Sequence, residues 1–488
     1  MKGCRLRVVC LLLFTWSISS VAQTRAAQPI DRTQLMAWLT ANLSSARLQR
    51  LVTERGAAFS LDPSYRKQLG AAGADPALIQ SLQKLPHAKN ATSAPCPPEL
   101  IRAAQLAHQK QFIDAEDQLR IVLRSAPDNA DLHFALGEVL RAQENWDAAF
   151  DEFTAAARLA PGFPEVHSRL AYLFYRSDDA DNAIAEARTA LSIDPANAEA
   201  YRYLGLGLYA NGRYSAALHA YEQSLTREPE NADVYYDMGI AQRDRGDLRA
   251  AVVAYRHAIR LRPDFWEAHT NLGIAFHDLG RLDDAVAEYR EAKRLVPEEP
   301  SVRSNLGNTY CDKGEYDAAV EEFKELYRIN GGWDGGHTCL ARAYMLKRDY
   351  PQAVSELRAA VRQNPTGAAE HRVLGQALLL DGKAAEALVE LQAAVKLSPD
   401  SAIAHHYLGT AYYETDQFRQ AEQEFRDALR LEPTADNHYA LAACLMTMNR
   451  NDEALAELEI ASRLDPGQKL YRARMEELLK LMKSPTAH

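Results

Sequence analysis

The sequence predicts an all-α solenoid built from stacked helical hairpins. Two ladders of single residue types, each with a step of 34 residues, carry this prediction. Prolines form the first ladder, at Pro127, Pro161, Pro195, Pro229, Pro263 and Pro297. Alanines form the second, at Ala115, Ala149, Ala183, Ala217, Ala251, Ala285, Ala319, Ala353, Ala387 and Ala421. A fixed period of this length indicates an array of equal supersecondary units.

Each repeat is predicted to form two amphipathic helices joined by a short turn. In the repeat from Ala198 to Pro229, apolar residues spaced by three and four positions lie on both sides of the turn "ANGRY". The first face holds Tyr201, Leu204, Gly205 and Leu208, and the second holds Ala217, Tyr221 and Ser224. The proline ends the second helix because it has no N–H to donate. Asn129, Asn197 and Asn231 stand two residues after a proline and are expected to cap the next helix.

This pattern resembles the tetratricopeptide repeat. The segment "AHTNLGIAFHDLGRLDDAVAEYREAKRLVP" matches the aromatic, Leu-Gly, Ala and Pro positions of that family at nearly every place. Eleven repeats fit into residues 96–466, and the resemblance implies a right-handed superhelical solenoid whose concave wall is lined by the first helix of each repeat. Ala103 replaces the family's glycine in the first repeat. Gly331 replaces a proline and is followed by Gly335 and Gly336, which predicts a soft junction between the seventh and eighth repeats.

Other features are predicted on both sides of the repeats. Residues 1–22 run from basic residues through an apolar stretch to small residues, which predicts a cleaved secretory signal peptide, with retention as an anchor as the alternative. Residues 23–85 are expected to form a small helical module, residues 86–95 a linker, and residues 467–488 a C-terminal capping helix and tail. We therefore expect an exported protein, periplasmic or secreted, without membrane insertion after signal cleavage.

Motifs for catalysis or cofactor binding are missing from the sequence. It has no P-loop, HExxH or GxSxG pattern, so neither a cofactor nor an enzymatic activity is predicted. The repeats resemble the arm of O-linked N-acetylglucosamine transferases, but no catalytic region follows them. The net charge of −10 argues against nucleic acid as a partner, because phosphate binding needs a basic face. The four cysteines beyond residue 22 form no CxxC pair and are expected to be isolated buried thiols.

Histidines recur at one position of the repeat. They are His133, His167, His269, His337, His371 and His405. Equivalent side chains on neighbouring hairpins are separated by about 8–10 Å, whereas zinc needs its nitrogen ligands at about 2 Å. The sequence therefore predicts packing aromatic residues with a polar tip and no metal site.

The candidate partner-binding residues occupy the positions that the resemblance assigns to the concave wall. Tyr and Arg are enriched at binding hot spots, and Asn amides can hold an extended peptide backbone. The candidates are Arg169, Tyr172, Tyr175, Arg176, Arg202, Tyr203, Tyr209, Tyr236, Asp237, Arg243, Asn271, Asn305 and Asn308. Joint replacement of Arg169, Tyr172, Arg202 and Tyr203 by alanine is expected to leave the melting temperature nearly unchanged.

Taken together, these features predict an exported scaffold or adaptor that binds peptides or protein segments in the concave groove of the solenoid. The alternative is a carbohydrate-handling component of a polysaccharide export or glycosyl-transfer assembly, in which the tyrosine rings would stack on sugars. Binding experiments with peptides and with polysaccharides separate the two.

Overall fold

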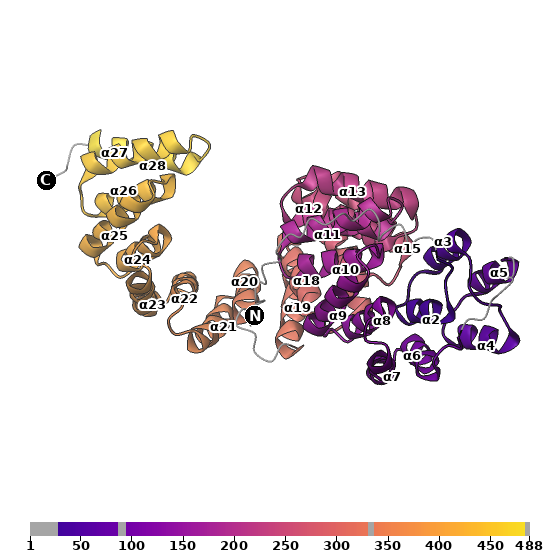
Figure 1. Cartoon of the computed structure of the whole chain (residues 1–488). Coiled ribbons are helices and arrows are strands. Elements are labelled where there is room, and N and C mark those ends of the chain that lie inside the picture. The colour runs from indigo at the N-terminus through magenta and orange to yellow at the C-terminus, as the bar shows by residue number, and fades with distance from the viewer. Residues whose placement is uncertain (1–27, 86–93, 330–335, 484–488) are drawn as a thin grey trace. The chain divides into compact units, whose positions relative to one another are not determined.

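The structure is a computed structural model that describes residues 28–85, 94–329 and 336–483. These ranges hold 27 α-helices and no sheet, apart from one bridge that pairs Ile30 with Ala57 (Figure 1). Contacts divide the chain into two compact units, residues 1–263 and 264–488, and each is treated by itself. The predicted signal peptide, most of the predicted linker, Gly331 and Gly335 lie outside the described residues.

The described residues of the first compact unit form four short helices followed by five helical hairpins. The short helices are α2 (Arg32–Thr40), α3 (Ser45–Arg55), α4 (Pro63–Ala71) and α5 (Pro76–Lys84). The hairpins are α6 (Pro98–His108) with α7 (Phe112–Ser125), α8 (Ala130–Ala142) with α9 (Trp146–Leu159), α10 (Pro164–Arg176) with α11 (Ala180–Ile193), α12 (Ala198–Ala210) with α13 (Tyr214–Arg227), and α14 (Ala232–Asp244) with α15 (Leu248–Leu261).

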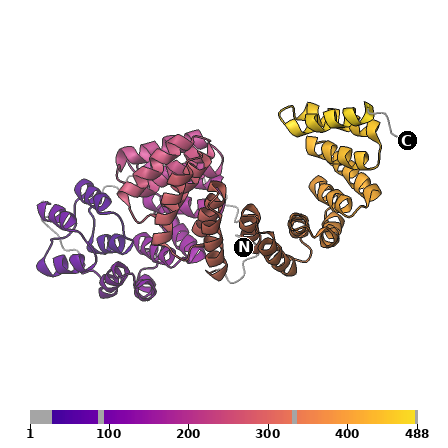
Figure 2. The same ribbon diagram turned by 180° about the vertical axis from the view of Figure 1, so that it is seen from behind.

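Six hairpins and one further helix are found in the part of the second compact unit that the structure describes. The hairpins are α16 (Trp266–Asp278) with α17 (Leu282–Leu295), α18 (Pro300–Lys313) with α19 (Tyr316–Ile329), α20 (Gly336–Leu346) with α21 (Tyr350–Gln363), α22 (Ala368–Leu380) with α23 (Ala384–Leu397), α24 (Ala402–Glu414) with α25 (Phe418–Leu431), and α26 (Ala435–Thr447) with α27 (Asn451–Leu464). The last helix is α28 (Lys469–Lys483). Figure 2 shows the same pairing of consecutive helices from behind.

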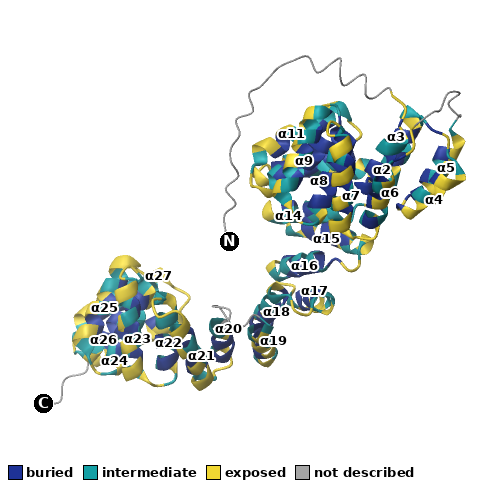
Figure 3. Ribbon diagram, turned by 60° about the horizontal axis from the view of Figure 1, so that its bottom comes forward, coloured by how far each residue is buried: buried dark blue, intermediate teal, exposed yellow. Residues whose placement is uncertain are grey.

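Polar caps and glycines explain why these sequences form hairpins. The predicted caps are confirmed, because the side chains of Asn129, Asn197 and Asn231 each accept a hydrogen bond from the backbone N–H three residues further on. Within a hairpin, the second helix lays an aromatic ring on a glycine of the first. A Cβ atom at Gly205 would lie only 2.3 Å from the ring of Tyr221. The glycine therefore sets the close approach of the two helices, and buried residues gather where consecutive helices face each other (Figure 3).

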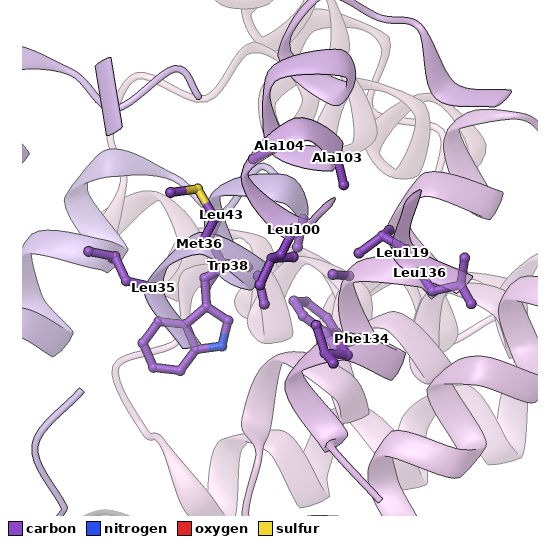
Figure 4. Packing of buried hydrophobic residues seen from close by; sticks show 14 of the residues in the cluster. Leu35, Met36, Trp38, Leu43, Leu100, Ala103, Ala104, Leu119, Phe134 and Leu136 are labelled. Atoms are coloured by element: carbon purple, nitrogen blue, oxygen red, sulfur yellow. The ribbon is translucent and has the colours of Figure 1, made fainter. Parts of the chain in front are cut away.

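The four N-terminal helices share one apolar core with the first hairpins. Helix α2 packs against α6 and α8, and Trp38 is only 2% exposed. The indole ring lies 6.3 Å from the ring of Phe163, which in turn lies 4.9 Å from Phe134. Figure 4 shows Trp38, Leu100 and Phe134 in this common cluster. The N-terminal helices thus cover the first hairpins of the array and do not stand apart from them.

At the C-terminal side, α28 packs against α27. Leu478 is fully buried, and the hydroxyl of Tyr471 donates a hydrogen bond of 2.6 Å to Asp436 on α26. The other side of α28 leaves Leu470 and Leu481 exposed, so its outward face is less polar than that of an ideal solenoid cap. None of the described helices combines the length and the apolar character that are required to cross a membrane.

Candidate partner-binding surface

The first helices of the hairpins form a common wall in each compact unit. Helix α10 contacts α12, α12 contacts α14, and in the second unit α22 contacts α24. The second helices pack mainly against first helices, so they lie on the opposite side. We call the surface of the first helices the inner wall and that of the second helices the outer wall. All thirteen candidate residues belong to first helices, namely α10, α12, α14, α16 and α18.

Arg169, on α10, lies inside the inner wall and is only 8% exposed. Its guanidinium pairs with the carboxylates of Glu138 on α8 and Glu199 on α12, and Glu199 also accepts a hydrogen bond of 3.0 Å from the hydroxyl of Tyr203. Burial alone would lower the pKa of Arg169, but the two carboxylates outweigh it and raise the pKa above its usual range. The group is therefore a buried ion network that joins three hairpins.

A similar ion pair joins the next two hairpins along the chain. Arg202 on α12 donates a hydrogen bond of 2.7 Å to Asp237 on α14, and Asp237 is only 7% exposed. Tyr203 is also buried, at 8% exposure. Arg169, Tyr203 and Asp237 consequently offer little surface to a partner. The expectation that Arg169, Arg202 and Tyr203 can be replaced without loss of stability conflicts with the burial of Arg169 and Tyr203 and with the ion pairs of both arginines. Replacement of Arg202 would leave the buried carboxylate of Asp237 without its cation, and replacement of Arg169 would leave Glu138 with Arg141 alone.

Other candidates in the first compact unit keep part of their side chains accessible. Tyr175, Tyr209, Tyr236 and Arg243 are half-buried along α10, α12 and α14. The hydroxyl of Tyr209 donates a hydrogen bond of 2.5 Å to Asp244. The remaining two candidates lie near the same wall: the ring of Tyr172 is 5.4 Å from that of Tyr203, and the guanidinium of Arg176 is 3.9 Å from the ring centroid of Trp146.

In the second compact unit, the candidate asparagines are half-buried on neighbouring helices. Asn271 lies on α16, and Asn305 and Asn308 lie on α18. The side-chain oxygen of Asn308 accepts a hydrogen bond of 3.2 Å from Arg342 of the next hairpin. The three amides thus lie on first helices of this unit, and that of Asn308 is engaged by a neighbouring hairpin.

Two buried hydroxyl groups behind the accessible tyrosines escaped the sequence analysis, which assigned Tyr221 to packing alone. The hydroxyls of Tyr221 and Tyr255 are buried and have no hydrogen-bond partner within the described chain. Each ring crosses the glycine of its hairpin. The ring of Tyr255 lies 6.0 Å from that of Tyr236, and Tyr221 belongs to the cluster against which Tyr175 and Tyr209 pack. Burial raises the pKa of both phenols, so both remain protonated donors.

The N-terminal helices also contact the start of the inner wall through polar groups. The indole N–H of Trp38 donates a hydrogen bond of 3.0 Å to Asp131 at the start of α8. Arg47 on α3 pairs with Glu165 at the start of α10, and its second contact, with Asp194 before α12, is 2.9 Å long. These acids therefore hold the N-terminal helices in place. No periodic signal marks Trp38 or Arg47, so repeat analysis could not find them.

The recurring histidines have a partner that the sequence analysis missed. In seven hairpins the histidine Nδ1 lies 2.5–2.7 Å from a glutamate oxygen 19 residues later, on the second helix of the same hairpin. The pairs are His133–Glu152, His167–Glu186, His269–Glu288, His337–Glu356, His371–Glu390, His405–Glu424 and His438–Glu457. The signal was available: where the first position is Tyr, as in Tyr201 and Tyr235, the second is Ala.

One of these pairs lies in the one group with metal-ligand spacing that occurs among the described residues, His405, Glu424 and Asp427. Both ring nitrogens of His405 are engaged, Nδ1 with Glu424 at 2.6 Å and Nε2 with the carbonyl of Pro399 at 3.0 Å. A cation would have to displace one of these contacts, so we assign the histidine to the hairpin.

The His133–Glu152 pair predicts a pH-dependent contribution to stability. Its hydrogen bond with Glu152 raises the pKa of His133, against the opposing effect of burial. A histidine whose pKa is raised by folding stabilises the folded state in its protonated form. This contribution is complete below the unfolded pKa of about 6.5 and is lost as the pH rises through the folded-state pKa. His133→Phe is therefore expected to lower the free energy of unfolding by about 1 kcal/mol more at acidic than at alkaline pH. Chemical denaturation at both pH values measures this, and Tyr201→Phe, which has no carboxylate partner, should show no such difference.

Comparisons with solved structures return helical-repeat proteins. A tetratricopeptide repeat protein from Parabacteroides merdae is 16% identical over 51% of this chain and 98% of its own, with a TM-score of 0.41. Yeast Tom70 is 15% identical over 79% and 96%, with a TM-score of 0.40. YrrB, described as a TPR protein with an unusual peptide-binding site, is 22% identical over 40% and 97%, with a TM-score of 0.33. A search of curated proteins found no match.

Tetratricopeptide repeat models match the sequence in both compact units. The matched residues are 105–164, 164–197, 208–252, 236–300, 301–330, 375–416 and 408–469, which together make up more than half of the chain. Proteins with these repeats typically are non-enzymatic scaffolds that bind proteins or peptides. With its eleven described helical hairpins and these matches, the chain belongs to the tetratricopeptide repeat family.

Proposed function

We propose that the chain is an exported scaffold that binds an extended peptide or protein segment on the inner wall of the third to fifth hairpins. The observation that carries this proposal is the pair of unpartnered hydroxyls of Tyr221 and Tyr255. A buried polar group without a hydrogen bond costs about 1–3 kcal/mol. Both side chains are fully buried, so a ligand reaches the hydroxyls only where the half-buried tyrosines of the inner wall move aside, and it then recovers that cost by accepting the two hydrogen bonds.

The surroundings of the two hydroxyls suit a peptide backbone. Carbonyl oxygens recur along an extended chain and accept hydrogen bonds, which is the chemistry that two spaced phenols offer. Tyr175, Tyr209 and Tyr236 are half-buried next to them and supply apolar area at a low cost in side-chain entropy. Arg243 adds a donor for acidic side chains, although it also contacts Asp244. Arg169 and Arg202 join neighbouring first helices through ion pairs, and we do not assign them to the area that contacts the ligand.

The phenols give a test in which stability and binding move in opposite directions. Tyr221→Phe combined with Tyr255→Phe removes two unpaired hydroxyls, so the free energy of unfolding is expected to rise by about 1 kcal/mol or more. Binding of an immobilised peptide library should weaken by about tenfold. Tyr289→Phe, at the same repeat position in the sixth hairpin, is the matched control and should leave binding unchanged. Unaltered peptide binding in the double variant would refute the proposed surface.

The same purified protein separates the two classes of ligand. Its tyrosine fluorescence is titrated with the peptide library and, in a second arm, with mixed polysaccharide. Saturable binding to polysaccharide alone would favour the carbohydrate-handling role over peptide binding. Saturable binding to peptides that depends on Tyr221 and Tyr255 supports the scaffold role.

Export is supported by the order of basic, apolar and small residues in segment 1–22. The mature protein recovered from the extracytoplasmic fraction is expected to begin at Gln23. Mass spectrometry of the intact protein measures this, and a chain that retains residues 1–22 in the membrane fraction would indicate an anchor.

A further inference from the structure

The fourth hairpin carries an open pocket on its outer wall, away from the inner-wall surface. The pocket has a volume of about 390 Å³ and is lined by α11, α12 and α13. Leu204, Leu208 and Ala216 supply apolar lining, and Arg188 and Arg213 supply charge. It therefore combines a small apolar floor with two cations.

The pocket opens where the fourth hairpin lacks the side-chain pair found in most others. The paired repeat positions hold histidine and glutamate in seven hairpins, and Arg303 with Glu322 in the seventh hairpin along the chain. Here they hold Tyr201 and Ala220, and both residues line the pocket. The methyl group of Ala220 leaves free the space that a glutamate side chain fills elsewhere, and it removes the carboxylate.

Both arginines of the pocket lack an acidic partner. Arg188 and Arg213 are exposed, and neither forms an ion pair or a hydrogen bond with another side chain of the described chain. Arg227 adds further positive charge next to the pocket, since its guanidinium lies 4.2 Å from the ring centroid of Tyr201. In a chain with a net charge of −10, this group of unpaired cations is complementary to an acidic ligand.

The fifth hairpin provides an internal contrast. It has the same Tyr–Ala combination, Tyr235 with Ala254, but the ring of His257 stacks on Tyr235 at 4.9 Å and occupies the space. The positions equivalent to Arg188 and Arg213 hold Glu222 and Asp247. The Tyr–Ala combination alone thus does not make an anion site. The pocket at the fourth hairpin differs from the fifth hairpin by the presence of Arg188 and Arg213.

A larger pocket in the second compact unit does not share this character. It is lined in part by Arg426 and Arg450 and has a volume of about 790 Å³. Both arginines pair with Glu422, at 2.6 and 2.7 Å, so their charge is already compensated. The larger volume therefore does not make it the better anion site.

We propose that the outer pocket of the fourth hairpin binds a glutamate side chain of a partner protein, next to an apolar residue of the same segment. The partner's carboxylate takes the place that the repeat's own glutamate occupies in other hairpins and pairs with the arginines of the rim. The neighbouring apolar side chain lies on Leu204 and Ala216. This gives the scaffold a second docking surface, on the wall opposite to the peptide-binding surface proposed above.

The test uses the full mature chain and a labelled, amidated peptide in which glutamate and leucine alternate. Fluorescence anisotropy is expected to show saturable binding that weakens with added salt. Arg188→Gln with Arg213→Gln should weaken it by about tenfold or more. Arg249→Gln, an exposed arginine of the next hairpin, is the matched control and should bind as the unaltered chain does. The same peptide with glutamine in place of glutamate should not bind.

A second variant fills the pocket with the chain's own side chains. Tyr201→His with Ala220→Glu restores the pair present in seven hairpins, so it should fold with an unchanged circular dichroism spectrum and lose the acidic peptide. The Tyr221→Phe/Tyr255→Phe variant should retain it, which separates this pocket from the inner wall. Retained binding in the filled variant overturns the proposal. Equal binding of the glutamine peptide, or competition by inorganic phosphate at equal concentration, overturns recognition of a glutamate side chain.

Discussion

Arg169→Met is expected to lower the free energy of unfolding of the first compact unit by about 3–5 kcal/mol, the usual cost of removing one partner from a buried ion pair. The guanidinium is buried and pairs with Glu138, whose side chain is 4% exposed, and with Glu199. Its removal leaves Glu199 with the hydroxyl of Tyr203 alone and Glu138 with Arg141 as its remaining cation, and the two like charges then repel each other across α10. Urea unfolding followed by far-ultraviolet circular dichroism measures the loss.

The matched control is Arg176→Met on the same helix. Arg176 is exposed and its guanidinium lies over the ring of Trp146, so its replacement should cost about 1 kcal/mol or less. A compensating variant, Arg169→Met with Glu138→Gln and Glu199→Gln, removes the charges together and should recover part of the loss. If Arg169→Met lowered the free energy of unfolding no more than Arg176→Met does, the ion network would not stabilise the array. Arg169 would then be a candidate for direct contact with a partner.

Arg169 is buried and Tyr175 is half-buried, although both occupy positions that predict the concave wall. The position in the repeat therefore does not predict whether a side chain is accessible. Both were assigned to the concave wall from their places in one helix, and both do lie on first helices. Whether such a residue is accessible depends on side chains 30 or so residues away on the neighbouring hairpins, such as Glu138 and Glu199. These identities vary from repeat to repeat, so the period predicts the direction of a side chain and not its burial.

Local features were predictable because their causes are local. The asparagine caps and the proline stops each depend on residues within one hairpin or at its edge, and the structure has them as expected. The contact between a glycine and an aromatic ring is equally local, although it was not among the predictions. The histidine–glutamate pairs belong to the same class. Comparison of the two repeat positions 19 residues apart, His with Glu against Tyr with Ala, would have indicated a direct contact. The cationic pocket at Arg188 follows from an exception to that pairing.

Docking of the N-terminal helices could not be predicted in this way. The hydrogen bond from Trp38 to Asp131 spans 93 residues, and the ion pair from Arg47 to Glu165 spans 118. Neither residue of the N-terminal helices belongs to the repeat, and no sequence pattern connects them to their partners. The sequence indicated amphipathic helices in this region, whereas only the structure shows that their apolar faces continue the core of the array.

Trp38→Ala is expected to destabilise the first compact unit by about 3–5 kcal/mol, as large-to-small replacements of buried aromatic residues do. The indole is 2% exposed and lies between α2 and the rings of Phe163 and Phe134, so its removal leaves a cavity at the junction of the N-terminal helices and the array. Asp131 loses its indole donor as well. Thermal unfolding and hydrogen exchange of α2 and α8 measure the effect.

Two further variants distinguish packing from polar anchoring. Trp146→Ala replaces a half-buried tryptophan of the array and should cost less than Trp38→Ala, since more of its ring already contacts water. Trp38→Phe keeps most of the apolar volume but loses the hydrogen bond to Asp131, so an intermediate loss is expected. If Trp38→Ala accelerated hydrogen exchange in α2 but left α8 as protected as before, the N-terminal helices would be an independent module. Faster exchange in both helices would instead show that the N-terminal helices act as a cap of the solenoid, because Trp38 covers the ring of Phe163, which in turn packs on Phe134.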